Sequence, residues 1–318
     1  MQRYIIHRLI QMVPLLLGVS VIIYFLLSMV PGDPVDLLIT ANPNVKMEDV
    51  ARLKHAYGLD QPIYIRYGKW LERTVTGDLG WSRVYKRPAG KMVLQRLPNT
   101  VTLMSAALLV SLLIAIPVGI YSAKRQYSFL DYIFTVLAFL GQSMPSFWFG
   151  IMLILLFAVK LHWLPPGGMM DIGVANTVFT RLKYLILPTV VLSLINVGRW
   201  ARYMRSTMLE VINQDYIRTA RAKGLTDRAV TYRHAFRNAL IPVITLLAIE
   251  IPGLFSGATI TETVFSWPGI GKLNYDSIML NDYAVAMASI MIFAILVVFF
   301  NLVADIAYAL ADPRVRYE

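Results

Sequence analysis

The amino-acid sequence predicts an all-α, polytopic membrane protein with six transmembrane helices and a helical extracytoplasmic loop. Of its 318 residues, 57% are hydrophobic and only 15% are charged, whereas an ordinary soluble domain has about a quarter charged residues. The charges are also unevenly placed, because none falls within residues 9–30 or 101–122. A run of about 20 apolar residues is long enough to cross a hydrocarbon layer of about 30 Å.

The predicted spans are six apolar segments, at about 9–30, 100–122, 132–159, 184–203, 239–261 and 284–310. The first follows Arg3 and Arg8, as the apolar part of a signal peptide does. It is longer than the about 7–15 apolar residues of a signal peptide, and no small-residue cleavage pattern follows it, so we expect an uncleaved span. The third contains Gly141 and Pro145, and the proline is expected to kink it.

The distribution of lysine and arginine predicts that both termini and the loop 204–238 are cytoplasmic. With that orientation, fifteen lysines and arginines lie on the cytoplasmic side and four lie in the short outer loops. Cytoplasmic loops carry such an excess, and long loops cross the membrane largely regardless of charge. The fifteen include Arg199 and Arg202, which enter the end of the fourth span.

Three parts organise the chain: an N-terminal segment with the first span at 1–30, an extracytoplasmic helical loop at 31–98, and a core of five spans at 99–318. A helix is expected within 61–76, begun by Pro62 and ended by Gly77, and a second over 46–57. The first would be amphipathic, because one of its faces collects Ile63, Tyr67, Trp70, Leu71 and Thr74. The loop would either cover the outer ends of the spans or receive something delivered from outside.

Catalytic and metal-binding patterns are missing from the sequence. There is no cysteine, the four histidines fall in four separate segments, and neither a His-Glu-x-x-His nor a Gly-x-Ser-x-Gly motif occurs. No phosphate-binding Gly-x-x-x-x-Gly-Lys-Ser/Thr loop is present either, so the chain is not expected to bind or hydrolyse ATP. Membrane orientation accounts for the net charge of +11, and nucleic-acid binding is not expected.

Glu250 is the most unusual residue within a predicted span. A carboxylate there costs roughly 2.5–3.5 kcal/mol on insertion scales, so it should face the bundle interior, water or a partner. It either lines a pathway and attracts the positive end of a substrate, or is buried and paired with a serine or backbone group. Its neighbours Pro252 and Gly253, with Ser143 and Pro145 of the third span, complete the set of expected pathway residues.

Residues 216–224 form a short basic segment that is expected to be helical. Ile217, Ala220 and Gly224 would share one narrow face of small apolar residues, which suits close approach to another protein better than to lipid. Gly224 can adopt the left-handed conformation that ends a helix, and the next residues can cap a second helix. The alternative is a solvated basic loop that serves only orientation.

Residues 210–227, Glu-Val-Ile-Asn-Gln-Asp-Tyr-Ile-Arg-Thr-Ala-Arg-Ala-Lys-Gly-Leu-Thr-Asp, resemble the cytoplasmic loop of ABC-importer permeases, where a helix followed by glycine docks into the ATPase subunit. The general Glu-Ala-Ala start is replaced here by Arg218-Thr219-Ala220, and the closing proline comes late, at Pro242. Both departures look like the peptide/nickel branch. Other segments are also similar to that branch, namely residues 30–34 (VPGDP), 77–80 (GDLG), 143–148 (SMPSFW), 261–271 (TETVFSWPGIG) and 312–316 (DPRVR).

The resemblance covers essentially the whole chain and implies a type I importer permease, the first of a pair, in a bacterial or archaeal cytoplasmic membrane. It implies a second homologous permease, two cytoplasmic ATPase subunits that hold ATP and Mg, and an extracytoplasmic binding protein. The implied cargo is di- or oligopeptides, with glutathione or a nickel chelate as alternatives within the family. From a different class, a self-sufficient secondary transporter stays open, whereas the missing catalytic groups argue against an intramembrane enzyme.

The resemblance also assigns roles to residues. The ATPase-coupling residues would be Tyr216, Ile217, Arg218, Thr219, Ala220, Arg221, Ala222, Lys223, Gly224, Leu225, Thr226 and Asp227. An outer gate is expected at the outer end of the fifth span, from Glu262 and the turn Trp267-Pro268-Gly269. The alternative for this turn is a packed interfacial loop with Trp267 in the aromatic belt of the membrane.

Overall fold

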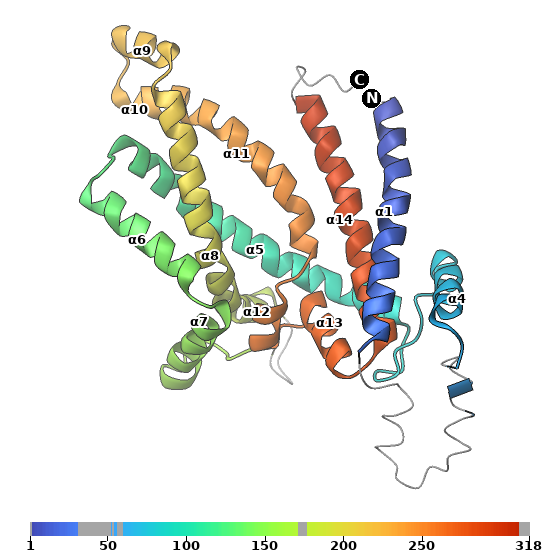
Figure 1. Cartoon of the computed structure of the whole chain (residues 1–318). Helices are drawn as coiled ribbons and strands as arrows, with labels where there is room; N and C mark the ends of the chain where they lie inside the picture. The colour runs from blue at the N-terminus through green and yellow to red at the C-terminus, as the bar shows by residue number, and fades with distance from the viewer. Residues whose placement is uncertain (1, 31–51, 53, 56–59, 171–176, 312–318) are drawn as a thin grey trace.

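The computed structural model describes residues 2–30, 52, 54–55, 60–170 and 177–311, and among these it contains helices and connecting turns without a β-strand (Figure 1). The long helices are α1 (Gln2–Ser28), α5 (Ala89–Lys124), α8 (Val178–Ile212), α11 (Arg237–Glu250) and α14 (Tyr283–Ala311). The chain between α5 and α8 forms α6 (Phe129–Ser143), α7 (Ser146–Leu153) and the π-helical segment η1 (Ile154–Lys160). The short elements are α4 (Ile63–Val75), α9 (Asp215–Ala222), α10 (Asp227–Ala229), the π-helical η2 (Val230–Phe236), the 3₁₀ segment η3 (Ile251–Phe255), α12 (Thr259–Val264) and α13 (Ile270–Met279).

Membrane-spanning capacity is confirmed for the predicted apolar segments. Five helical stretches are long and apolar enough to cross a membrane, at Ile6–Ser28, Ala89–Lys124, Val178–Ile212, Asp227–Phe255 and Tyr283–Asp305. A sixth span arises if Phe129–Ser143 and Ser146–Lys160 are taken together, and these two stretches are bent by 102°. The expected kink at Pro145 is therefore a full break, because Met144 is extended ahead of the proline.

Several boundaries differ from those predicted by hydropathy. The second span begins at Ala89 rather than near 100, because its polar first turns pack against α13 and α14 and stay helical. The fourth runs on to Ile212 rather than ending at 203, so much of the predicted loop 204–238 is helical. The fifth ends at Phe255 rather than 261, where Gly257 adopts a positive φ of 76°.

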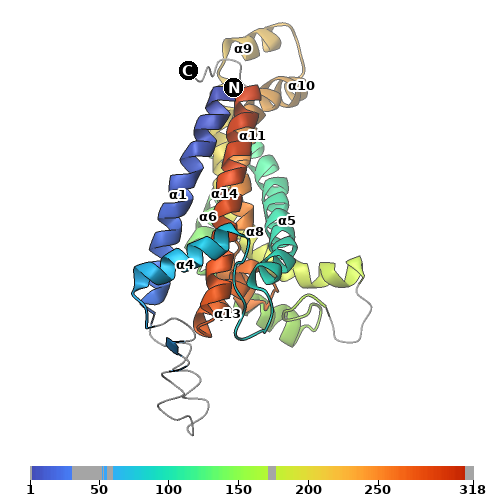
Figure 2. The same cartoon turned by 90° about the vertical axis from the view of Figure 1, so that its right-hand side faces the viewer.

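The helix predicted within 61–76 is confirmed as α4, and it packs on α1. The Tyr67 hydroxyl lies 2.8 Å from Ser20 Oγ, and the Tyr24 ring contacts the rings of Tyr67 and Trp70 at centroid distances of 5.5 and 5.7 Å. Figure 2 shows α4 lying across α1 at the end of the molecule away from α9. Most of the second helix predicted in this loop, at 46–57, lies outside the described residues.

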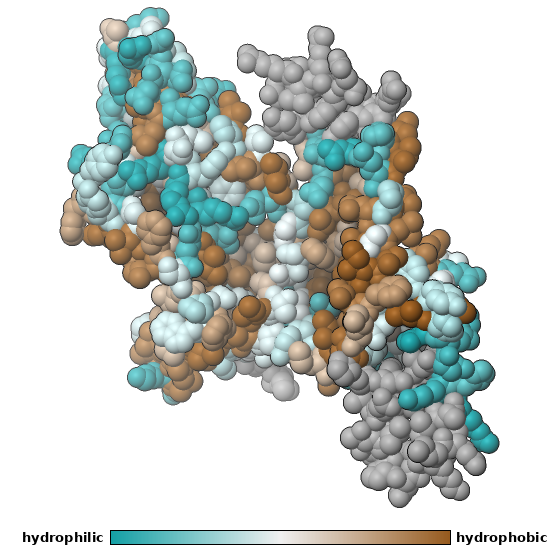
Figure 3. Space-filling view, viewed as in Figure 1, coloured by the Kyte–Doolittle hydropathy of each residue, from teal (hydrophilic) through white to brown (hydrophobic). Residues whose placement is uncertain are grey.

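The centre of the bundle is the packing of α8 along α5. Gly119 of α5 permits this approach, since a Cβ there would lie 2.6 Å from the Met204 Cβ. The start of α1, the end of α14 and α9 all lie at one end of the molecule (Figures 1 and 2). Figure 3 shows hydrophobic surface along α1 and hydrophilic surface over α9 and α10, as expected if lipid covers the former and water the latter.

Candidate functional site

The expected short basic helix is present as α9, and its capping follows the prediction. Gly224 ends it with a φ of 76°, in the left-handed region that favours glycine. The Thr226 hydroxyl then accepts a hydrogen bond from the Ala229 amide at 3.3 Å and caps α10. A Cβ on Gly224 would meet no atom within 4 Å, so the space beside this residue is open.

The face of α9 that was expected to dock on a partner is instead turned inward. Ile217 is 0% exposed and Ala220 is buried, both within a cluster that includes Met208 and Val230. The loop folds back on the ends of the spans, so its few apolar side chains are covered by the chain itself. For Ile217 and Ala220 the prediction of a contact surface is therefore wrong, whereas Gly224, the third residue of the predicted face, is exposed.

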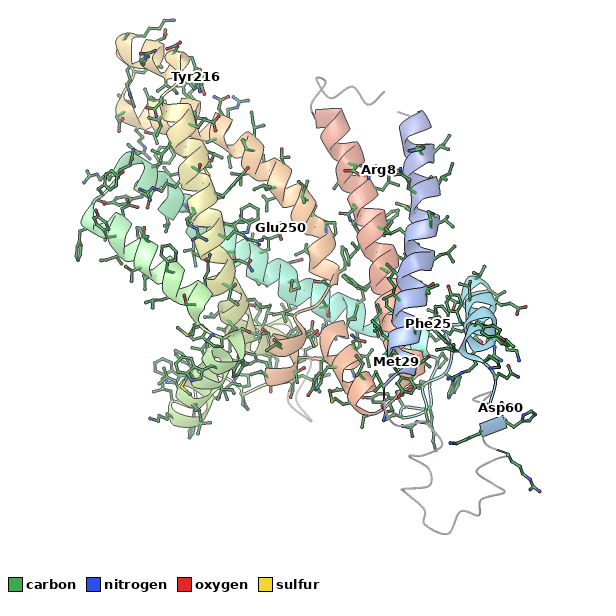
Figure 4. All side chains as sticks on the ribbon, in the orientation of Figure 1. Arg8, Phe25, Met29, Asp60, Tyr216 and Glu250 are labelled. Carbon is green, nitrogen blue, oxygen red and sulfur yellow. The ribbon has the colours of Figure 1, made fainter. Side chains whose placement is uncertain are left out.

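The exposed face of α9 is polar and basic. Its members, with the turn that follows, are Tyr216, Arg218, Thr219, Arg221, Ala222, Lys223, Gly224, Leu225, Thr226 and Asp227. Figure 4 places Tyr216 at the tip of the molecule, where partial burial raises the pKa of its phenol above the ordinary value. Arg218 pairs with Asp215 along the same helix.

A salt bridge ties the α9–α10 turn to the transmembrane bundle. Lys124 Nζ at the end of α5 lies 2.5 Å from Asp227 Oδ2 at the start of α10. Together with the buried Ile217, this contact holds α9 to two different parts of the bundle. A force on the exposed face would therefore reach α5 directly, as well as α8 and α11 through the chain.

Three arginines lie along α8 at a spacing of three residues, where sequence reasoning missed their importance. Arg199 Nη1 donates to Glu250 Oε1 of α11 at 2.7 Å, Arg202 Nη2 to Gln142 Oε1 of α6 at 2.9 Å, and Arg205 Nη2 to Asp131 Oδ2 of α6 at 2.9 Å. The sequence places Arg199 and Arg202 at the end of a predicted span, because the uncharged part of that segment is short. The arginines at i, i+3 and i+6 share one helix face, and that spacing was the available signal.

Arg199, Arg202 and Arg205 lie in α8 rather than in a cytoplasmic loop, and Arg181 and Lys183 lie in α8 rather than in an outer loop. Without these five residues, twelve lysines and arginines remain on the cytoplasmic side and two on the outer side, so the excess persists. Arg199 lies roughly 20 Å along α8 from the end that carries α9, and roughly 30 Å from the opposite end. Its charge therefore sits well inside the helix, where charged side chains face a water-filled space or pair with one another.

Glu250 and Arg199 line an open pocket of about 320 Å³ between α8 and α11. The other lining residues are Trp200, Arg202, Tyr203, Ser206 and Leu246. The second expectation for Glu250 is wrong, because its partner is an arginine rather than a serine or backbone group, and its side chain is 36% exposed. The expectation that it lines a pathway stays a prediction. Figure 4 shows Glu250 at the lower end of α11, facing α8, and Figure 3 shows a hydrophilic patch over the middle of α8.

The expected pathway residues come from two places in the bundle. Ser143 and Pro145 are exposed in the break between α6 and α7, beside Gln142, which accepts a hydrogen bond from Arg202, but neither of them lines the pocket of Glu250. Gly253 is exposed one turn beyond Glu250, whereas Pro252 is buried. Glu250, Ser143, Pro145 and Gly253 thus remain accessible, and a pathway role for Pro252 would have to act through the backbone.

The residues expected at an outer gate form a buried network. Glu262 is 0% exposed, and its carboxylate accepts from Thr100 Oγ1 and from the Lys272 amide, both at 2.9 Å. Thr100 Oγ1 in turn accepts from the Ile270 amide at 2.8 Å. Gly269 packs directly on the carboxylate, since a Cβ there would lie 2.4 Å from Glu262 Cδ.

Trp267 is buried rather than placed in an aromatic belt. It is 1% exposed, and packs with Leu103 of α5 and Tyr184 of α8. Its indole Nε1 donates to the Asn99 carbonyl at 3.0 Å, while Asn99 Nδ2 donates to the Pro268 carbonyl at 2.8 Å. The turn 267–269 and the first half of α5 therefore form one rigid unit.

Ionisable groups that could hold a metal are not gathered anywhere in the described part of the chain, where no cluster of three or more His, Cys, Asp or Glu residues occurs. What the described residues provide is an open pocket between spans that is lined by charged as well as apolar side chains, and a helix with an exposed basic face at one end of the bundle. Charged side chains that face a pocket between membrane-spanning helices are typical of a multi-pass membrane transport protein.

Comparison with known proteins identifies the family. Residues 115–317 match the family described as binding-protein-dependent transport system inner membrane component, and residues 1–104 match the N-terminal family of such membrane components. The chain belongs to this family of transport permeases, whose members are not enzymes. ATP-driven ABC importers contain these permeases.

Relatives align with the chain from end to end. It is 44% identical to the oligopeptide transport system permease protein AppB of Bacillus subtilis (strain 168) over 100% of both chains. It is 37% identical to the di/tripeptide transport system permease protein DppB of Pseudomonas aeruginosa (strain UCBPP-PA14), again over 100% of both. The dipeptide transport system permease protein DppB of Alkalihalophilus pseudofirmus is 35% identical over the same full coverage.

Proposed function

We propose that this chain forms one half of the transmembrane pathway of an ATP-driven importer that carries di- or oligopeptides into the cytoplasm. The observation that carries the mechanism is α9, a helix with an exposed basic face held firmly at one end of the bundle. The end-to-end similarity to peptide permeases supports the substrate class. A second, homologous permease would supply the other half of the pathway.

Coupling to ATP hydrolysis would run through the exposed face of α9 and the turn after it. Two cytoplasmic ATPase subunits bind ATP and Mg, and each permease docks on one of them. The buried Ile217 packs α9 on the ends of the spans, and the exposed Lys124–Asp227 salt bridge adds a link from α10 to α5. Closure of the ATPase pair would therefore displace α5, α8 and α11 instead of bending a loose loop.

The charges near the end of the molecule that carries α9 indicate how the chain is oriented in the membrane. We place α9, the start of α1 and the end of α14 in the cytoplasm, because twelve lysines and arginines outside α8 favour that side. The opposite end, with α4, α12 and α13, then faces the extracytoplasmic binding protein that delivers the peptide. The expected gate residues Glu262, Trp267, Pro268 and Gly269 lie there, and because hydrogen bonds join the first three to Asn99 and Thr100 of α5, they would move with that helix.

The experiment is uptake by the complete importer in proteoliposomes, with the binding protein on the outer side and ATP inside. Labelled di- and oligopeptides should accumulate with ATP and not with a non-hydrolysable analogue. Accumulation that follows an ion gradient without ATP would favour the secondary transporter. Uptake of glutathione or a nickel chelate in place of peptides would correct the substrate.

A further inference from the structure

The pocket between α8 and α11 carries an excess of positive charge. Its charged lining groups are two guanidinium groups, Arg199 and Arg202, and one carboxylate, Glu250. The Glu250 carboxylate forms a salt bridge with Arg199 at 2.7 Å. Arg202 donates to the neutral amide oxygen of Gln142 at 2.9 Å and forms no ion pair with any described residue. The pocket therefore has a net charge of +1.

The side chains of the Arg199–Glu250 pair are more exposed than those of the third arginine of α8, Arg205, and its partner. In the Arg205–Asp131 pair the side chains are 27% and 5% exposed. The Asp131 carboxylate also accepts a hydrogen bond from the amide of Tyr127, just before α6. The Arg205–Asp131 pair is therefore part of the packing between α8 and α6. In the Arg199–Glu250 pair the side chains are 51% and 36% exposed, and Arg202 is exposed as well. The positive charge without a counter-ion, that of Arg202, is thus accessible to a solute.

We propose that the pocket of Arg199, Arg202 and Glu250 binds the free α-carboxylate of the transported peptide, with Arg202 as the main contact. This rests on the proposed function and names the chemical group of the substrate that the pathway recognises. A guanidinium presents a planar set of donors that matches the two oxygens of a carboxylate. The Phe139 ring, 5.5 Å from the Arg202 guanidinium carbon, helps to orient that plane.

Glu250 then has a role opposite to the attraction of a positive substrate end. By neutralising Arg199 it limits the pocket to one uncompensated positive charge. A transport site must bind its solute firmly enough to accept it and weakly enough to release it. Two free guanidinium groups beside each other would hold a carboxylate more tightly and delay its release.

Equilibrium binding of a small peptide tests the proposal directly. Labelled trialanine and trialanine amide are titrated against the purified complex of both permeases and both ATPases, without the binding protein, so that its own selectivity does not enter. The wild-type complex should bind trialanine about 10-fold more tightly than the amide, the effect of one charge-assisted hydrogen bond. Arg202→Gln should remove that preference, and Arg202→Lys should keep part of it.

Arg125→Gln is the matched control, because it removes an exposed arginine at the end of α5, outside the pocket. It should leave the preference intact, and the melting temperature of each complex shows that the variants are folded. Equal binding of acid and amide, no binding of trialanine, or a preference that persists in Arg202→Gln would each overturn the proposal. Failure of the proposed function is separate, because it shows as absent ATP-dependent peptide uptake by the wild-type importer.

Discussion

Arg199 and Glu250, fifty-one positions apart in the sequence, meet at 2.7 Å and join α8 to α11 in the middle of an apolar bundle. The pair is accessible from the pocket on one side, so it can set the charge that a passing solute meets. Because the neighbouring Arg202 has no counter-ion among the described residues, the number of free positive charges depends on whether this pair is intact.

Charge counting predicts how variants of this pair behave. Glu250→Gln raises the charge of the pocket by one, so trialanine should bind about 10-fold more tightly and leave more slowly, which lowers the maximal uptake rate. Arg199→Gln removes one positive charge and should weaken binding. The double variant restores the original net charge and should bind trialanine within about threefold of wild type. A double variant that binds trialanine as weakly as Arg199→Gln, or as tightly as Glu250→Gln, would contradict this account.

Replacing Gly224 by aspartate should abolish peptide uptake while the protein still inserts and folds. The left-handed φ of 76° costs an L-residue about 1–2 kcal/mol, but the new side chain has open space within the chain. Loss of uptake would then come from contact with the ATPase. Gly77→Asp is the control, since Gly77 also has a positive φ and equal space. Normal ATP-coupled uptake by Gly224→Asp would refute the docking role.

The two faces of α9 should respond differently to truncation. Ile217→Ala removes a fully buried side chain, and should lower the free energy of unfolding by about 2–4 kcal/mol. Tyr216→Ala, on the exposed face, should leave the melting temperature of the permease unchanged and reduce copurification of the ATPase subunits. Thermal unfolding in detergent and quantitative pull-down separate the two effects. Equal melting temperatures for the two variants would mean that Ile217 is not buried in the protein as folded.

A methyl group at Gly269 should destabilise the network around Glu262. The added Cβ would lie 2.4 Å from the Glu262 carboxyl carbon, and the carboxylate cannot retreat because Thr100 and the Lys272 amide hold it. We expect a loss of about 1–3 kcal/mol, typical of overpacking, measured as a lower melting temperature. Gly253→Ala is the control, because its Cβ would meet nothing within 4 Å. If the two variants have the same melting temperature, the network does not stabilise the fold.

Much of the architecture could be predicted from local sequence properties. The apolar segments, the helix within 61–76 and the glycine that ends α9 depend on hydropathy, periodicity and one backbone conformation, and each was identified correctly. The boundaries were less accurate, because polar residues such as those at the start of α5 stay helical when other elements cover them. The roles of individual side chains were predicted less well than the elements that carry them.

The sequence by itself determined the number and order of the apolar segments, the basic loop and the family resemblance, because these are properties of contiguous residues. Only the tertiary structure decided that Ile217 points inward, that Glu262 is buried, and that Arg199 faces Glu250 within the bundle. Each of these facts depends on which distant helix covers a given face. Helical periodicity says which residues share a face, whereas the packing of α8, α11 and α5 selects what that face meets.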